Sequence, residues 1–222
     1  FADAGGRRVA LGWVMEGRSR EAQLAAGWSG LISLPRVLAL DAGGALTMTP
    51  HPALQQLRGD HAALAPRRLP AQAAPQPLEI AGDCLELRLE LDPGSAAYCG
   101  VALRCAPDGA EQTLIVYDQE RRRLSIDRSR SSLDQAVDHG ERGGPLRLEP
   151  NEPLRLQIFV DRSVVEVFAN ERACLTSRIY PTRPNSLGVT LFAHGGEAAM
   201  LAGDSWTMRA IWSGSPSGDE GA

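Results

Sequence analysis

Residues 154–180 constrain the fold most, because three short β-type runs follow one another there with brief polar breaks between them. From Leu154 to Val160 an apolar side chain recurs at every second position, which is the period of a strand with one buried face. Asp161-Arg162 and Asn170-Glu171 interrupt the pattern, and Asn tolerates the left-handed backbone of a tight turn. Loops this short join only antiparallel neighbours. We therefore predict a three-stranded β-meander.

The rest of the chain continues this pattern of short strands and turn signals. Between residues 84 and 91, Leu alternates with charged residues, and Pro107-Asp-Gly109 is typical of a β-turn. About ten such strands predict an all-β chain whose C-terminal part is a two-sheet antiparallel β-sandwich. Besides the meander and 84–91, strands are predicted over 7–14, 31–40, 45–49, 98–105, 112–117, 123–126, 187–193 and 203–212.

Few segments favour other structures. Residues 50–57 predict two turns of helix, since Pro is tolerated at the first helical position. Residues 17–27 are predicted as a loop despite a weak helical pattern, and the polar stretch 127–151 as a long surface loop. Pro35 confines the predicted strand 31–40 to a sheet edge or a bulge.

Composition argues against several classes of function. The 222 residues are 43% hydrophobic and 23% charged, as in an ordinary globular protein with a sizeable core. The net charge of -4, with scattered Arg and no Lys, disfavours nucleic acid and anionic membranes as partners, and no apolar run is long enough to span a bilayer. The four cysteines show no paired spacing and are predicted to be free, and the four histidines show no metal spacing, so neither a metal nor another cofactor is predicted.

Two groups of motifs point to a known family. FVDRSVVEVFAN (159–170), RACLTSRIYPTR (172–183) and SLGVTLFAHGG (186–196) resemble the C-terminal β-sandwich of glycoside hydrolase family 32, the family of invertases, levanases, inulinases and sucrose-6-phosphate hydrolases. Upstream, RRVALGWVMEGR (7–18) and GWSGLISLPRVLAL (27–40) resemble the end of the same family's five-bladed β-propeller. The resemblance covers roughly residues 5–212, with the motifs in the expected order.

The resemblance implies a domain organisation. Residues 1–58 would be the end of the catalytic β-propeller with a short linker helix, and 59–77 a linker that carries a first irregular strand. Residues 78–214 would be the sandwich, and 215–222 a flexible tail. The chain opens at Phe1 without a Met, so we expect a piece of a longer protein. The absence of any Asn-x-Ser/Thr acceptor and the unpaired cysteines favour the cytoplasm over secretion.

The resemblance also implies a reaction, the hydrolysis of terminal β-D-fructofuranosyl bonds of sucrose or fructans with retention, which needs two carboxyl groups. In the family these are an Asp nucleophile in an Asn-Asp-Pro-Asn-Gly motif and a Glu acid/base in a Glu-Cys motif, with a stabilising Asp in Arg-Asp-Pro. None of the three motifs occurs in this sequence. No catalytic residue is therefore assigned, and the chain alone is predicted to be inactive, with both catalytic carboxyl groups and the main sugar contacts upstream.

Trp13 and Glu16 are the remaining candidates for substrate binding. The Gly-Trp position resembles the family's tryptophan that walls the fructosyl pocket, and sugar faces pack well on aromatic rings. The alternative is a core Trp between blades, which we favour slightly. Glu16 would rim the same pocket, but a solvated surface carboxylate is the preferred interpretation.

Other polar residues are given structural roles. A catalytic carboxylate pair of Asp161 and Glu166 is disfavoured, because a sandwich hairpin offers no deep cleft. We expect Asp161 to bind the turn backbone and Glu166 to meet an Arg or water. Trp28, Trp206 and Trp212 are predicted to be packing residues.

Two alternative functions stay open. A lectin-like carbohydrate-binding sandwich would need exposed aromatic side chains, and only 5% of the residues are aromatic. The sandwich would otherwise be an interaction surface that forms a homodimer.

Overall fold

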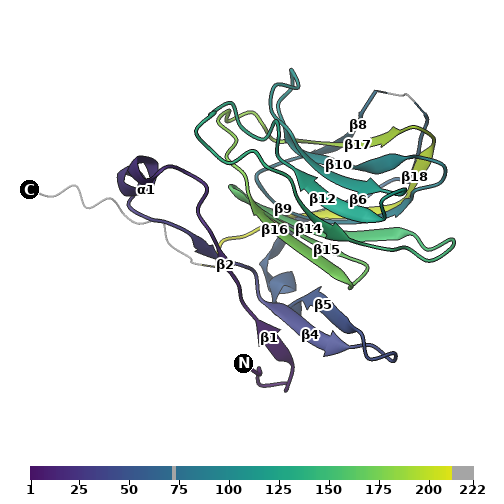
Figure 1. The fold of residues 1–222 in the computed structure, drawn as a ribbon, viewed down its shortest axis with the longest axis horizontal. Helices are drawn as coiled ribbons and strands as arrows, with labels where there is room; N and C mark the ends of the chain where they lie inside the picture. The colour runs from purple at the N-terminus through teal and green to yellow at the C-terminus, as the bar shows by residue number, and fades with distance from the viewer. Residues whose placement is uncertain (72–73, 212–222) are drawn as a thin grey trace, which may run out of the picture.

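A computed structural model describes residues 1–71 and 74–211, and it shows two antiparallel sheets stacked face to face (Figure 1). The six-stranded sheet has the order β13 (Arg142–Pro145), β12 (Arg123–Asp127), β11 (Thr113–Asp118), β10 (Tyr98–Cys105), β17 (Gly188–His194) and β8 (Gln76–Ala81). The seven-stranded sheet has the order β16 (Ala173–Arg178), β15 (Val164–Ala169), β14 (Leu154–Asp161), β9 (Cys84–Asp92), β18 (Ala198–Met208) and β6 (Arg58–Leu64), with β7 (Arg67–Leu69) also paired to β18. The predicted all-β sandwich is confirmed.

The predicted meander forms β14, β15 and β16. Ile158 pairs with Val167, and Val165 pairs with Ser177, so the three strands are antiparallel neighbours. Both turns have a left-handed backbone, with φ of 49° at Arg162 and 47° at Asn170. The short polar breaks in the sequence thus set the register of this half of the sheet.

The core lies between the two sheets and is built by the alternating apolar residues. In β9, Leu85, Leu87, Leu89 and Leu91 are all buried, and Ile158 from β14 joins them. Burying a Leu or Ile side chain contributes about 1.5–3 kcal/mol. The period-two pattern read from the sequence is therefore the pattern that stabilises the sandwich.

The N-terminal region, residues 1–50, forms two small sheets below the sandwich in Figure 1. The predicted strands 7–14 and 31–40 are each broken in two at Gly12 and Ser33, which bind each other. The Ser33 amide donates to the Gly12 carbonyl at 2.8 Å, and the Gly12 amide donates to Ser33 Oγ at 2.9 Å. Pro35 lies in the second break. The elements are β1 (Arg8–Ala10), β4 (Arg36–Leu40) and β5 (Leu46–Pro50) in one sheet, and β2 (Trp13–Val14) and β3 (Leu31–Ile32) in the other.

The prediction of a loop over residues 17–27 is wrong, since α1 (Arg20–Ala26) lies there. Ser19 caps its first turn by accepting from the Ala22 amide at 3.2 Å, and Gly27 ends it with a φ of 74°. No residue of α1 is buried, so it has no apolar face for a periodicity argument to detect. The helix predicted at 50–57 is present as a 3-10 helix, η1 (Pro52–Leu57).

Three further stretches differ from the prediction because tertiary pairing, rather than local sequence, decides their structure. The predicted loop 127–151 contains the edge strand β13, whose glycines have little strand preference. The predicted linker 59–77 carries β7 and most of β6, both paired with β18. The last strand begins at Ala198 rather than Gly203, and Trp212 lies outside the described residues.

Glu111 links two loops at one end of the sandwich by hydrogen bonds, one containing Leu133 and the other containing Thr182 to Ser186. Its side chain is fully buried, and its carboxylate accepts five hydrogen bonds. Burial opposes its ionisation, but the donors outweigh burial and lower the pKa of Glu111 to about 2. The donors are the amides of Leu133, Thr182 and Arg183 and the hydroxyls of Thr182 and Ser186.

We expect Glu111→Gln to lower the free energy of unfolding at pH 7 by about 3 kcal/mol, because an unfolded Glu has a pKa of about 4.3 and each pKa unit corresponds to about 1.4 kcal/mol. A lowered folded-state pKa stabilises above the unfolded pKa, and that contribution is lost as the pH falls through 4 toward 2. Urea unfolding from pH 7 to pH 2.5 should therefore show a shallower acid limb for the variant. Glu79 is exposed, so Glu79→Gln should match the wild type. An unchanged acid limb in Glu111→Gln would contradict the role of Glu111.

Candidate functional site

The N-terminal region is joined to the sandwich by a buried ion pair between Arg36 of β4 and Glu166 of β15. Arg36 Nη2 donates to Glu166 Oε2 at 2.7 Å, and the Leu34 amide donates to Glu166 Oε1 at 2.6 Å. Thr176, which faces Glu166 across β15 and β16, donates to Oε2 at 3.0 Å. Both carboxylate oxygens are thus occupied by donors that fix the position of the N-terminal region.

Glu166 is only 2% exposed, which makes this pair costly to disturb. Burial raises the pKa of its carboxyl, and the Leu34 amide and Arg36 act in the opposite direction. Removing one member of such a pair leaves an uncompensated buried charge. The expectation that Glu166 meets an Arg is confirmed.

An apolar cluster lies beside the ion pair. Phe159 and Phe168, from the outer face of the sheet, meet edge to face with ring centroids 6.2 Å apart, and Leu54 of η1 packs on them. Strand β15 is therefore buried on both faces, one against the core and the other beneath the N-terminal region and η1. The sequence signalled this double burial by the near-continuous apolar run of residues 164–169.

A second polar contact brings Glu16 to Tyr180. The Tyr180 hydroxyl donates to Glu16 Oε1, and Arg18 Nη2 donates to Glu16 Oε2 at 2.7 Å. Burial of Glu16 opposes its ionisation, but these hydrogen bonds hold its pKa well below the ordinary value. The prediction of a solvated Glu16 is wrong, because its partner lies 164 residues away in the sequence.

Trp13 and Glu16 line one pocket, as expected from their proximity in the sequence. This pocket, called here the β2–β16 pocket, has a volume of about 540 Å³ and is lined mainly by β2, the loop after it, and β16. The Trp13 side chain is 66% exposed and lies over Gly30, where any Cβ would collide with the indole ring. Trp13 is thus not buried in a core of the described residues, and its contact with a sugar stays a prediction.

Asp161 does not serve the turn in the way that was predicted. The turn amide of Arg162 donates to the Asp83 carbonyl at 2.6 Å, while the Asp161 carboxylate lies 3.7 Å from the Cys84 thiol. Burial, and then the charge of Asp161, raises the pKa of the Cys84 thiol to about 11, so the thiol stays protonated at neutral pH. All four cysteines are free, as predicted.

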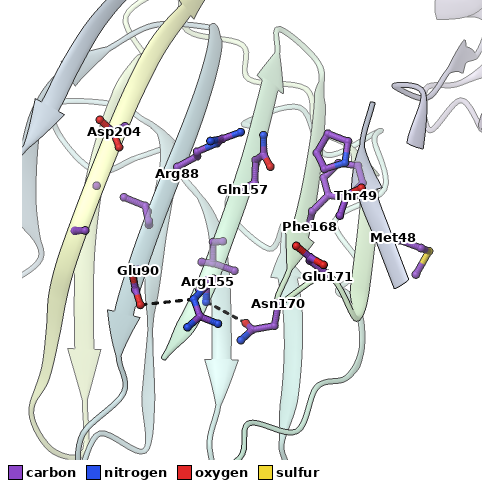
Figure 2. Close-up of a pocket in the computed structure, with 15 residues that line it drawn as sticks. Met48, Thr49, Arg88, Glu90, Arg155, Gln157, Phe168, Asn170, Glu171 and Asp204 are labelled. Carbon is purple, nitrogen blue, oxygen red and sulfur yellow. Dashed lines mark hydrogen bonds and ion pairs between the residues drawn. The ribbon is translucent and has the colours of Figure 1, made fainter. Parts of the chain in front are cut away.

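A second hollow, of about 570 Å³, lies on the outer face of the seven-stranded sheet beside β5 (Figure 2). Arg155 crosses its floor, 3.6 Å from Glu90, and the Arg155 amide donates to Asn170 Oδ1 at 3.0 Å. The aromatic residue in its lining is Phe168, which is buried. This hollow therefore lacks the exposed ring that a lectin-like sugar site would use.

Two further classes of site are not found in residues 1–71 and 74–211. There, His, Cys, Asp and Glu side chains do not gather in a group of three that could bind a metal ion. In the same residues, no helix has the length and apolarity needed to cross a bilayer.

Comparison with known proteins gives consistent matches over most of the chain. The sequence model described as glycosyl hydrolases family 32 C terminal matches residues 53–207. A sucrose-6-phosphate hydrolase of Zymomonas mobilis is 31% identical over 215 residues, which cover 94% of this chain and 40% of that protein. A levanase of Bacillus subtilis is 30% identical over 219 residues, which cover 95% of this chain and 32% of that protein.

The fold is also found in a solved structure. The crystal structure of fructan 1-exohydrolase IIa from Cichorium intybus superposes with a TM-score of 0.85 at 24% identity, covering 94% of this chain and 47% of that chain. The chain thus spans less than half the length of the relatives that it matches.

We expect Glu166→Gln and Arg36→Gln each to lower the free energy of unfolding by about 3–5 kcal/mol, because each leaves a buried charge unpaired. The double variant should lose less than the sum of the two, with a coupling energy of about 1 kcal/mol or more. Urea unfolding of the wild type, the two single variants and the double variant measures this coupling energy. As a matched control, Arg155 and Glu90 form an exposed pair at 3.6 Å, whose coupling should stay near 0–1 kcal/mol. Equal coupling in the two cycles would contradict the role of the buried pair.

Proposed function

Because the chain belongs to the glycosyl hydrolases of family 32, we propose that it is the C-terminal part of a β-fructofuranosidase that hydrolyses terminal β-D-fructofuranosyl bonds of sucrose or fructans. In this proposal the sandwich begins with β6 at Arg58, earlier than the expected residue 78, and the residues before η1 end the catalytic propeller. The family match over residues 53–207 is the observation that carries the proposal. The names of relatives that act on sucrose 6-phosphate, levan and fructan support this substrate class.

The surface of the N-terminal region supports a covering partner. Among residues 1–71 and 74–211, thirteen large hydrophobic side chains are exposed, and nine of these lie within the first 46 residues. Concentrated exposed apolar surface marks a contact site. We propose that further propeller blades of the same protein cover this surface, except for Trp13 and Met15, which line the β2–β16 pocket. The nine residues are Phe1, Leu11, Trp13, Met15, Leu24, Trp28, Ile32, Leu40 and Leu46.

The sandwich then acts as a support. The edge strand β16 and its neighbour β15 hold the N-terminal region: Glu166 of β15 binds Arg36, and Tyr180 just beyond β16 binds Glu16. Neither contact leaves a carboxylate free for acid–base chemistry, since Glu166 and Glu16 are both occupied by Arg donors. A retaining glycosidase needs two carboxyl groups about 5–5.5 Å apart, one as nucleophile and the other as acid. We infer that the propeller supplies both.

The isolated chain should therefore release no fructose from sucrose, inulin or levan. The measurement is a reducing-sugar assay with purified chain at micromolar concentration over a day. A chimera in which the chain replaces the corresponding C-terminal part of the Zymomonas mobilis relative serves as the positive control. It should hydrolyse sucrose. Fructose release by the chain alone would contradict the proposal that the propeller supplies both catalytic carboxyl groups.

In that chimera, Trp13→Ala should raise KM for sucrose roughly three- to tenfold, since a lost aromatic contact costs about 0.5–1.5 kcal/mol. Trp13→Phe should restore most of the affinity, because it keeps an aromatic face. Steady-state kinetics of the three proteins measures the effect. The same KM in all three would remove Trp13 from the substrate site and leave the rest of the proposal intact.

A further inference from the structure

Arg178, the last residue of β16, carries a buried charge that has no hydrogen-bond acceptor among the described residues. Its side chain is 3% exposed and lines the β2–β16 pocket. None of its three guanidinium nitrogens donates a hydrogen bond to any described residue. The guanidinium carbon lies 5.0 Å from the Tyr180 ring centroid and 5.2 Å from the Trp28 ring centroid, which are cation–π distances. A buried guanidinium normally has acceptors for these N–H groups.

The nearest carboxylate does not supply them. Glu16 Oε2 lies 3.7 Å from Arg178 Nη1, beyond hydrogen-bond distance, and the same oxygen already accepts from Arg18 at 2.7 Å. Glu16 Oε1 accepts from the Tyr180 hydroxyl and from the Gly17 amide. Arg178 therefore shares a carboxylate whose hydrogen-bonding capacity is used elsewhere.

The other arginines of the pocket add to this excess of positive charge. Asp138 accepts from both Arg128, at 2.8 Å, and Arg142, at 2.9 Å, so one carboxylate faces two guanidinium groups. Arg36 is matched by Glu166, but its buried Nε also lacks an acceptor among the described residues. Five arginines thus face three carboxylates around the pocket, an excess of +2. The arginines are Arg18, Arg36, Arg128, Arg142 and Arg178, and the carboxylates are Glu16, Asp138 and Glu166.

We propose that the β2–β16 pocket binds a phosphate group through the Arg178 guanidinium. The oxygens of a phosphate group can accept two parallel hydrogen bonds from the planar Arg guanidinium. The phosphate charge of about -1.5 to -2 matches the excess of +2 around the pocket. The pocket volume of about 540 Å³ holds more than the anion alone, and Trp13 lines the same pocket. Phosphate can arrive free or as the monoester of a sugar whose ring packs on Trp13. This site stands on the described residues alone and does not depend on the proposed hydrolase.

Isothermal titration of the chain tests the site, with inorganic phosphate, fructose 6-phosphate and fructose, each against sodium chloride at equal ionic strength. Both phosphate compounds should bind, and fructose should not bind at the same concentrations. Arg178→Gln should weaken phosphate binding roughly tenfold or more, the loss expected for charge-assisted hydrogen bonds. If fructose 6-phosphate binds more tightly than inorganic phosphate and Trp13→Ala abolishes the difference, the ligand is a sugar phosphate ester. If the two compounds bind equally, the ligand is free phosphate. Either result supports the site.

A surface variant keeps the test decisive if Arg178→Gln fails to fold. Met15 lines the pocket and its side chain is 76% exposed, so its replacement leaves the fold intact. Met15→Glu should weaken phosphate binding several-fold through charge repulsion, whereas Met15→Gln should bind as the wild type does. Absence of phosphate binding, or equal binding by wild type, Arg178→Gln and Met15→Glu, would overturn the proposal.

Discussion

The buried pair of Arg36 and Glu166 is the interaction on which the arrangement of the two parts depends. An apolar contact alone would tolerate small shifts of one surface over the other, because dispersion and hydrophobic contacts have little directionality. A buried carboxylate that accepts from Arg36, the Leu34 amide and Thr176 at once has one favourable geometry. Any displacement of β4 along the sheet would strip donors from a buried charge, so electrostatics specifies the register while the neighbouring phenylalanines supply contact area.

Strand β15 carries this constraint because it has no solvent face. Val165 and Val167 point into the core, and Glu166 and Phe168 point toward the N-terminal region and η1. The packing of Val165 and Val167 in the core therefore fixes the position of β15. It thereby also fixes the position of the Glu166 carboxylate on the opposite face. A substitution in the core at this strand would be felt at the contact between the two parts, since close-packed interiors transmit small shifts. The sandwich is thus a rigid support, and the N-terminal region is attached to it at β15, the strand next to the sheet edge.

Much of the fold follows from the sequence, and the rest could not be predicted for identifiable reasons. The meander was predictable because Leu154 to Val160 alternate with period two and short turn signals at 161–162 and 170–171 bound the β-type runs that follow. Helix α1 was missed because it buries no side chain, and β13 because its glycines carry no strand preference. In the β2–β16 pocket, the proximity of Trp13 and Glu16 could be predicted because the two residues are close in the sequence. The burial of Glu16 was not, because Tyr180 and Arg178 reach it across most of the chain length.

The contact between Glu16 and Tyr180 has a consequence for Trp13. The Gly17 amide donates to the Tyr180 hydroxyl at 2.8 Å, and Glu16 is held by the same hydroxyl, so the loop after β2 is fixed to the end of β16. Trp13 lies one strand residue before that loop, with Gly30 beneath its ring. A mobile loop would let the ring swing away from Gly30 and would add an ordering cost to any ligand that packs on it. By immobilising the loop at residues 16 and 17, the sandwich pre-organises an aromatic surface that belongs to the other part of the chain.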